Sequence, residues 1–133
     1  MGRGRMGRDW YSEEKQGIAL SILLKPMISP SQIMPVSLLA GLCICKALEA
    51  AAGLSCQVKL PNDVIVNGRK IAGVLIEMST IGEMVQFIVL GAGINANNTV
   101  FPEEISAVAT SIFLETDRVC SRKAIVCKIL EYF

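Results

Sequence analysis

The Asn67-Gly68 dipeptide constrains the fold of this chain more than any other sequence feature. It lies between two apolar runs, residues 64–66 and residues 70–77. Asn-Gly accepts positive φ at both central positions of a two-residue turn, and such turns join adjacent antiparallel strands. The sequence therefore predicts a β-hairpin with its tip at Asn67-Gly68.

Further elements follow from apolar runs, caps and turn residues. Strands are expected over residues 17–25, 56–59 and 84–90, and helices over 31–52 and 121–133. Residues 17–25 are a continuous apolar run, which predicts a strand buried on both faces. Ser31 is the expected cap of the long helix, and Gly53 is its expected stop. Together these elements predict an α+β domain, with a mixed, largely antiparallel sheet flanked by helices.

The composition narrows the classes of function. The chain has 133 residues, enough for one domain, with 52% hydrophobic residues and a net charge of +1. It has no histidine, which argues against His-based triads and zinc sites, and its five cysteines include no Cys-x-x-Cys pair. Reduced cysteines and the lack of an apolar leader predict a cytoplasmic protein. The near-zero net charge argues against a nucleic-acid partner.

One segment has the apolar character of a membrane span. Residues 36–54 are largely apolar but are interrupted by Lys46 and Glu49. These charges predict a buried helix and no membrane partner.

Residues 2–10 read Gly-Arg-Gly-Arg-Met-Gly-Arg-Asp-Trp. Glycines allow backbone amides to point at an anion, and arginines bind carboxylate and phosphate through planar forks. The pattern predicts a loop that binds an anionic substrate. A flexible tag or an Arg/Gly nucleic-acid tail is the alternative, but Trp10 and Tyr11 favour a loop anchored to a core.

Two further segments carry candidate ligand-binding residues. Lys70 begins an apolar strand, and Gly73 leaves room for a ligand beside it, although Lys70 taken alone also suits an ordinary hairpin edge. Residues 91–95 read Gly-Ala-Gly-Ile-Asn, a weak signal of phosphate proximity that a simple turn would also explain.

The order and spacing of these motifs resemble the biotin–protein ligase family. The matching patterns are Gly-Arg-Gly-Arg-x-Gly-Arg-x-Trp at 2–10, Lys-x-Pro-Asn-Asp at 59–63, Lys-x-x-Gly-x-Leu-x-Glu at 70–77 and Gly-x-Gly-x-Asn at 91–95. Ala-Thr-Ser at 109–111 is a weaker match. Met6 stands where the family often has arginine, and Leu60 where it usually has tryptophan.

The resemblance implies a fold similar to that of class II aminoacyl-tRNA synthetases and biotin synthetase. It also implies that residues 1–133 form a partial catalytic domain, truncated at both ends. The family's Ser-Thr-Asn segment and glutamine lie upstream of the arginine loop, so they are expected to be missing. An N-terminal DNA-binding domain and a C-terminal barrel are likewise not expected.

The resemblance also implies roles for individual residues. The implied biotin-binding residues are Arg3, Gly4, Arg5, Lys70, Gly73 and Leu75. The implied nucleotide-binding residues are Arg8, Trp10, Asn62, Asp63, Gly91, Gly93 and Asn95. Lys70 and Arg5 are the implied catalytic residues, and no residue is assigned as a direct metal ligand.

The implied activity is that of a biotin–[acetyl-CoA-carboxylase] ligase. Biotin's carboxylate attacks the α-phosphate of ATP in the presence of Mg²⁺, and biotinyl-5′-AMP then reacts with a lysine of a biotin carboxyl carrier domain. A homodimer is a candidate assembly. The alternatives are an inactive or partner-dependent ligase remnant, a lipoate–protein ligase, and a nucleic-acid binder that uses the Arg/Gly segment.

Overall fold

The computed structural model describes residues 2–4, 7 and 9–133. A 3-10 turn at Pro30–Gln32 precedes α1. In chain order, the other elements are β1 (Gly2–Arg3), β2 (Asp9–Trp10), β3 (Ile18–Leu24), α1 (Ile33–Ala52), β4 (Gln57–Lys59), β5 (Asp63–Val66), β6 (Arg69–Ile81), β7 (Met84–Ile94), α2 (Glu103–Ser106), α3 (Ile112–Thr116) and α4 (Arg122–Tyr132).

The main sheet has five strands in the order β3-β7-β6-β5-β4, and every neighbouring pair is antiparallel. The predicted hairpin is confirmed: Asn67 and Gly68 have φ of 50° and 77°, and the Val66–Arg69 pair closes the ladder. The parallel component among the described residues is an isolated bridge between Lys70 and Ala109. The α+β prediction is therefore confirmed, with a sheet whose named strands are all antiparallel.

The strands that carry the glycines are longer than expected. β7 continues through Gly91 and Gly93 to Ile94, because these residues pair with β6 on one side and β3 on the other. The interpretation of Gly91 and Gly93 as a simple turn is therefore wrong. The N-terminal segment, expected to be a loop, contains a short antiparallel ladder between β1 and β2.

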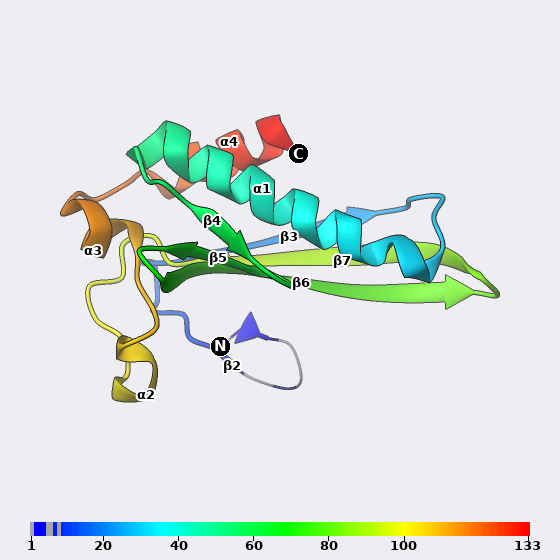
Figure 1. Ribbon diagram of the computed structural model, residues 1–133, viewed down its shortest axis with the longest axis horizontal. Coiled ribbons are helices and arrows are strands. Elements are labelled where there is room, and N and C mark those ends of the chain that lie inside the picture. Colours follow the sequence, from blue (N-terminus) through cyan, green and yellow to red (C-terminus); the bar gives the residue numbers. More distant parts are fainter. Residues whose placement is uncertain (1, 5–6, 8) are drawn as a thin grey trace.

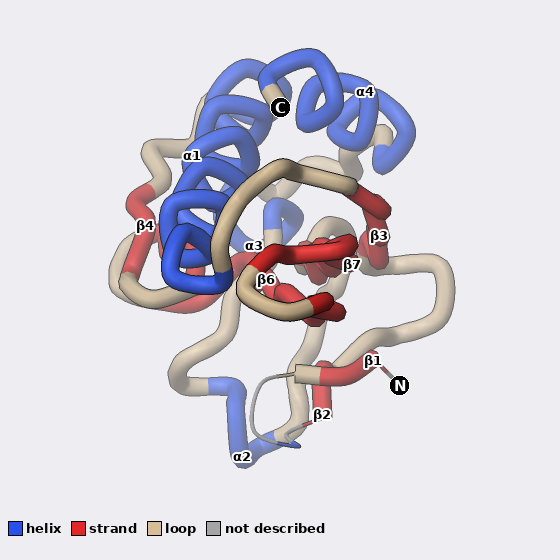
Figure 2. The backbone as a smooth tube through the Cα atoms, turned by 90° about the vertical axis from the view of Figure 1, so that its right-hand side faces the viewer, coloured by secondary structure: helices blue, strands red, loops and turns tan. Residues whose placement is uncertain are grey.

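Helices cover one face of the sheet. Figures 1 and 2 show α1 and α4 side by side on this face, and β1 and β2 on the opposite side of the sheet. The alternation of β7 explains the division, since Ile88, Leu90 and Ile94 are buried toward the helices whereas the intervening residues face the other way. The core is completed by Ile44 and Leu48 of α1.

The long helix begins one residue later than the sequence predicts, and only one side of it is buried. Its N-cap is Gln32, not Ser31, and the backbone N–H of Ser29 donates to Gln32 Oε1 at 3.0 Å in the preceding turn. Gly53 ends the helix as predicted, with φ of 69°. Leu38, Leu39 and Leu42 are exposed because they lie on the side of the helix that faces away from the core, a side that its nearly all-apolar sequence does not identify.

Residues 30–52 are long and apolar enough to cross a membrane by length and composition. Ala40, Ile44, Ala47 and Leu48 nevertheless pack into the core. Burial in the core therefore accounts for part of the apolar character of this helix, and a third of its apolar stretch is buried.

We predict that Leu48→Ala lowers the free energy of unfolding by about 2–5 kcal/mol, because it leaves a cavity at a fully buried position. Leu42→Ala is the matched control: it makes the same truncation in the same helix, but Leu42 is 46% exposed. Its effect should stay within about 0.5 kcal/mol. Urea unfolding followed by circular dichroism measures both, and equal losses would contradict the packing of α1 described above.

Candidate functional site

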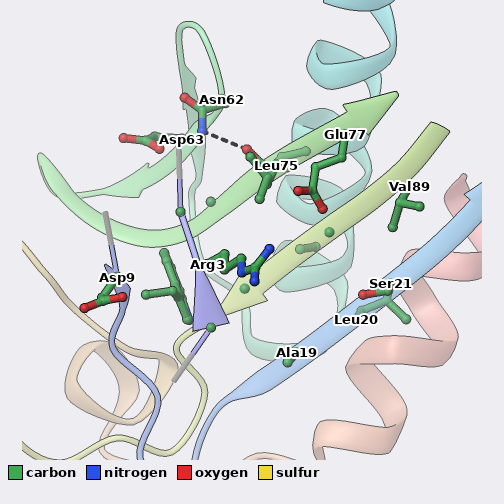
Figure 3. Close-up of a pocket in the computed structure, with 18 of the residues that line it drawn as sticks. Arg3, Asp9, Ala19, Leu20, Ser21, Asn62, Asp63, Leu75, Glu77 and Val89 are labelled. Carbon is green, nitrogen blue, oxygen red and sulfur yellow. Dashed lines mark hydrogen bonds between the residues drawn. The ribbon is translucent and has the colours of Figure 1, made fainter. Parts of the chain in front are cut away.

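A pocket of about 510 Å³ lies on the sheet face that the helices leave uncovered. Strands β3, β7 and β6 form its floor, and the β1–β2 segment and the turn before β5 form its walls (Figure 3). The described residues that line it are Gly2, Arg3, Gly4, Asp9, Trp10, Ala19, Leu20, Ser21, Pro61, Asn62, Asp63, Lys70, Gly73, Val74, Leu75, Glu77, Val89, Gly91, Ala92 and Gly93.

The floor of the pocket is built from small residues in register. Gly73 of β6 lies opposite Gly93 of β7, which in turn lies opposite Ala19 of β3. Two residues further along each strand, Gly91 lies between Leu75 and Ser21. Since side chains two residues apart share a face, these two rows form a shallow strip of small residues across the sheet, with Leu75 at one edge.

Trp10 lies on this strip. A Cβ atom built on Gly93 would lie 2.5 Å from Trp10 Cε2, and one built on Gly73 would lie 3.2 Å from Trp10 Cζ3. The first distance is far below van der Waals contact, so the indole ring occupies the space that a side chain at position 93 would need. Glycine at this position therefore allows Trp10 to form part of the pocket.

Lys70 and Asp63 form an ion pair at the edge of the floor. Lys70 Nζ lies 2.7 Å from Asp63 Oδ1 and 5.4 Å from the centroid of the Trp10 ring. Both charged side chains keep about a third of their surface exposed, 36% for Lys70 and 29% for Asp63. A ligand entering the pocket can therefore reach the lysine amine.

Two hydrogen bonds hold the turn before β5 against β6. Asn62 Nδ2 donates to the carbonyl oxygen of Val74 at 2.7 Å, as Figure 3 shows, and Val74 N–H donates to Asn62 O at 2.8 Å. These bonds tie residues 61–63 to β6. As a result, Asp63 is held within reach of Lys70.

The charge of the described lining is mixed. Two cationic side chains, Arg3 and Lys70, share the pocket with three carboxylates, Asp9, Asp63 and Glu77. Arg3 reaches from β1 over the sheet floor (Figure 3). This part of the pocket thus offers cationic groups for an anion and carboxylates for a cation.

The structure brings together most of the residues that the sequence analysis selected. Those that line the pocket are Arg3, Gly4, Trp10, Asn62, Asp63, Lys70, Gly73, Leu75, Gly91 and Gly93. Arg5 and Arg8 lie outside the described residues. Asn95 is not in the described lining: the residue is 5% exposed, and its Nδ2 donates to the Thr110 carbonyl at 2.9 Å.

Comparison with known proteins decides the family. The sequence profile of the Biotin/lipoate A/B protein ligase family matches residues 1–95. The chain belongs to this family. It is 37% identical over 134 residues to the bifunctional ligase/repressor BirA of Bacillus spizizenii, which spans 99% of this chain and 41% of BirA. It is also 37% identical over 115 residues to a biotin–[acetyl-CoA-carboxylase] ligase of Mycobacterium tuberculosis, covering 84% of this chain and 41% of that enzyme.

The fold agrees with this ligase family. The biotin protein ligase of Aquifex aeolicus, solved in complex with biotin and ATP, superposes with a TM-score of 0.85 at 34% identity. The match covers 98% of this chain and 53% of the Aquifex chain. This chain therefore spans about two fifths to one half of the length of these relatives.

Some pocket residues of this ligase-family chain were not selected from its sequence. Ala19 and Ser21 line the pocket because β3 is an edge strand with alternating exposure, so the prediction of a strand buried on both faces is wrong. Their small size within an apolar run is the signal that could have identified them. Glu77 lies in the quoted β6 motif, but the motif alone gave no role for its carboxylate.

We predict that Gly93→Ala displaces the Trp10 ring, because the added methyl group would overlap the indole. Trp10 is the single tryptophan of the chain, so intrinsic fluorescence reports it directly. Its emission should move to longer wavelength as the ring enters solvent. Gly91→Ala is the matched control on the same strand face, where the new methyl group meets Leu75 O at 3.7 Å, an ordinary contact. Identical spectra for the two variants would contradict this position of Trp10.

Proposed function

We propose that this chain activates biotin with ATP to form biotinyl-5′-AMP and transfers the biotinyl group to a lysine of a carrier domain. One observation carries the proposal: Lys70, Arg3 and the glycine floor surround a single pocket. The named activities of the relatives support it. BirA is a ligase and repressor by name, the Mycobacterium enzyme is a biotin–[acetyl-CoA-carboxylase] ligase by name, and the Aquifex protein was solved with biotin and ATP.

The first step needs cations that bring two anions together. A biotin carboxylate oxygen forms a bond to the α-phosphorus of ATP, and the bond from that phosphorus to the pyrophosphate oxygen breaks. Lys70 is the residue for this task, since its amine lies in the pocket beside the flat glycine strip. Its present partner, Asp63, keeps the amine in place before substrate enters and competes with the incoming carboxylate for it. A positioned cation at the reacting phosphate lowers the barrier electrostatically.

The small residues of the pocket floor leave room for the ring system of a ligand against the sheet. Trp10 covers Gly73 and Gly93, so a ligand can approach the backbone of the strip closely at Gly91, and Leu75 offers an apolar contact beside it. We assign the biotin rings to this strip and the carboxylate end to the neighbourhood of Lys70. Arg5 and Arg8 are expected to add positive charge from the arginine segment.

Mg²⁺ is the expected companion of ATP, and the donor set fits it. The described residues contain no cluster of three or more His, Cys, Asp or Glu side chains suited to a metal. Mg²⁺ in nucleotide sites is usually held by one or two carboxylates together with phosphate oxygens. Asp63 and Asp9 line the pocket and would provide such carboxylates. When bound, the ion neutralises phosphate charge.

Transfer needs no nucleophile from this chain. The carrier lysine amine attacks the carbonyl of biotinyl-5′-AMP, the bond from that carbonyl to the phosphate oxygen breaks, and AMP leaves with the electron pair. The chain's contribution is to hold the mixed anhydride and to shield it from water. The carrier domain, a homodimeric assembly and the lack of a nucleic-acid partner stay predictions, the last because the BirA relatives are repressors by name.

Lipoate is the second candidate substrate. The family includes lipoate ligases, and the Plasmodium falciparum LipL1 structure with lipoate shares the fold at a TM-score of 0.61. At 11% identity this likeness speaks for the fold alone. The arginine segment and the Pro-Asn-Asp turn favour biotin.

We predict that the purified chain forms biotinyl-5′-AMP from biotin and α-labelled ATP, and that Lys70→Ala abolishes this product. The reason is that the variant removes a cation from the point where the two anions meet. Chromatography of the labelled adenylate measures it. Lys123→Ala is the matched control, since it removes an exposed lysine of α4, an element that contributes no residue to the described pocket lining.

Wild-type rates in Lys70→Ala would remove Lys70 from the reaction. Absence of adenylate from the wild-type chain, under conditions where it is folded, would favour an inactive or partner-dependent remnant. A lipoyl adenylate formed in preference to the biotinyl one would assign the pocket to lipoate.

A further inference from the structure

A buried carboxylate lies behind the hairpin that carries Lys70. The Glu115 side chain, on α3, is 5% exposed. Its Oε1 accepts hydrogen bonds from Thr110 Oγ1 at 2.5 Å and from Arg69 Nη2 at 2.8 Å, and its Oε2 accepts one from Asn67 Nδ2 at 2.8 Å. Glu115 is not in the described lining of the pocket.

The environment of Glu115 keeps it ionised. Burial raises the pKa of this carboxyl, but the hydrogen bonds from Thr110 and Asn67 and the charge of Arg69 outweigh the burial and lower the pKa below its ordinary value. A buried carboxylate is costly unless it is paired and hydrogen-bonded, and Glu115 meets both conditions. Glu115 therefore accepts hydrogen bonds from three side chains at once, which distinguishes this contact from an isolated surface ion pair, although the Arg69 side chain is 40% exposed.

The partners of Glu115 adjoin Lys70 on two sides. Asn67 and Arg69 belong to the turn and strand start just before Lys70 in the sequence. On the other side, the backbone of Lys70 pairs with the segment before α3, because Lys70 N–H donates to Val108 O at 2.7 Å and Thr110 N–H donates to Lys70 O at 2.8 Å. Glu115 thus bonds to both segments that hold the Lys70 backbone.

The segment before α3 is itself anchored. Ser111 caps α3 by accepting from Leu114 N–H, and Ile112 N–H donates to Asn95 O at 3.1 Å. The Asn95 side chain holds the Thr110 carbonyl. Asn95 therefore supports the same segment from the end of β7, although it lies outside the described pocket lining.

We propose that Glu115 is a positioning residue for Lys70. By holding Asn67 and Arg69 against Thr110, it fixes the backbone from which the lysine side chain extends over the pocket. This matters because lysine has a long flexible stem, so that a loose backbone would spread the position of its amine. The contacts of Glu115 with Asn67, Arg69 and Thr110 are called the Glu115 clamp below. The proposal rests on the proposed function only in assigning Lys70 to the reaction, because the effect of the clamp on the hairpin does not depend on that reaction.

The test compares Glu115→Gln with Glu131→Gln in the whole chain. The control removes the same charge and breaks an ion pair of similar length, Lys128–Glu131 at 2.7 Å, which is exposed on α4. Asn67→Gly is a second variant, which loses one hydrogen bond to Glu115 and keeps a residue suited to positive φ. It can still be measured if Glu115→Gln fails to fold.

The first readout is hydrogen exchange at single amides. Glu115→Gln and, more weakly, Asn67→Gly should speed exchange at Lys70 and Thr110, whose N–H groups bridge the two segments. The Val74 N–H follows Lys70 on β6 and donates to Asn62 O, away from Glu115. Its exchange should stay at the wild-type rate. A general structural weakening would instead raise exchange throughout β6. Unchanged protection at Lys70 and Thr110 in both variants would overturn the clamp.

The second readout is adenylate formation at saturating biotin and ATP. Glu115→Gln should lower kcat by roughly 10-fold to 100-fold, the scale expected when a reacting group is misplaced by about 1 Å. The KM for biotin should change much less, and Glu131→Gln should match the wild type. A kcat equal to that of the control would overturn the positioning role. If the wild-type chain forms no adenylate, the proposed function fails. Hydrogen exchange at Lys70 and Thr110 is then the measurement that tests the Glu115 contacts.

Discussion

The pairing of Gly73 with Gly93 across β6 and β7 is the constraint on which the site depends. Two glycines opposite each other remove the side chains that would otherwise stand on this face of the sheet. Trp10 fills part of the resulting space, and Lys70 lies beside it with its amine near the indole. The pocket is therefore a consequence of strand register, because a shift of either strand by one residue would turn its glycine toward the helices and bring the neighbouring alanine, Ala72 or Ala92, to the pocket face.

Lys70 is held by three kinds of contact at once. Its amine pairs with Asp63, its backbone pairs with residues 108 and 110, and the turn before it is bonded to Glu115. The helices α1 and α4 contribute by burying the opposite face of the same strands. The apolar layer thus fixes the strands that carry the site, while the polar contacts fix the lysine on them.

Local sequence signals predicted the order and ends of the elements better than they predicted which side of a helix or strand is buried. The Asn67-Gly68 turn gave the β5–β6 hairpin and Gly53 gave the end of α1, because each depends on the conformation of one or two residues. The side of α1 that meets the sheet and the open face of β3 depend on long-range packing, which periodicity cannot resolve in uniformly apolar segments. The role of Glu115 was not predictable for the same reason, since two of its three partners, Asn67 and Arg69, lie more than 40 residues away in the sequence.

A crystal structure of this chain with a non-hydrolysable analogue of biotinyl-5′-AMP tests the central claim most directly. The account predicts the biotin rings over Gly91 beside Leu75, with Lys70 Nζ moved from Asp63 into hydrogen-bond distance of the analogue's phosphate. An analogue bound away from the glycine strip, or a Lys70 still paired with Asp63 and out of reach of the ligand, would contradict it.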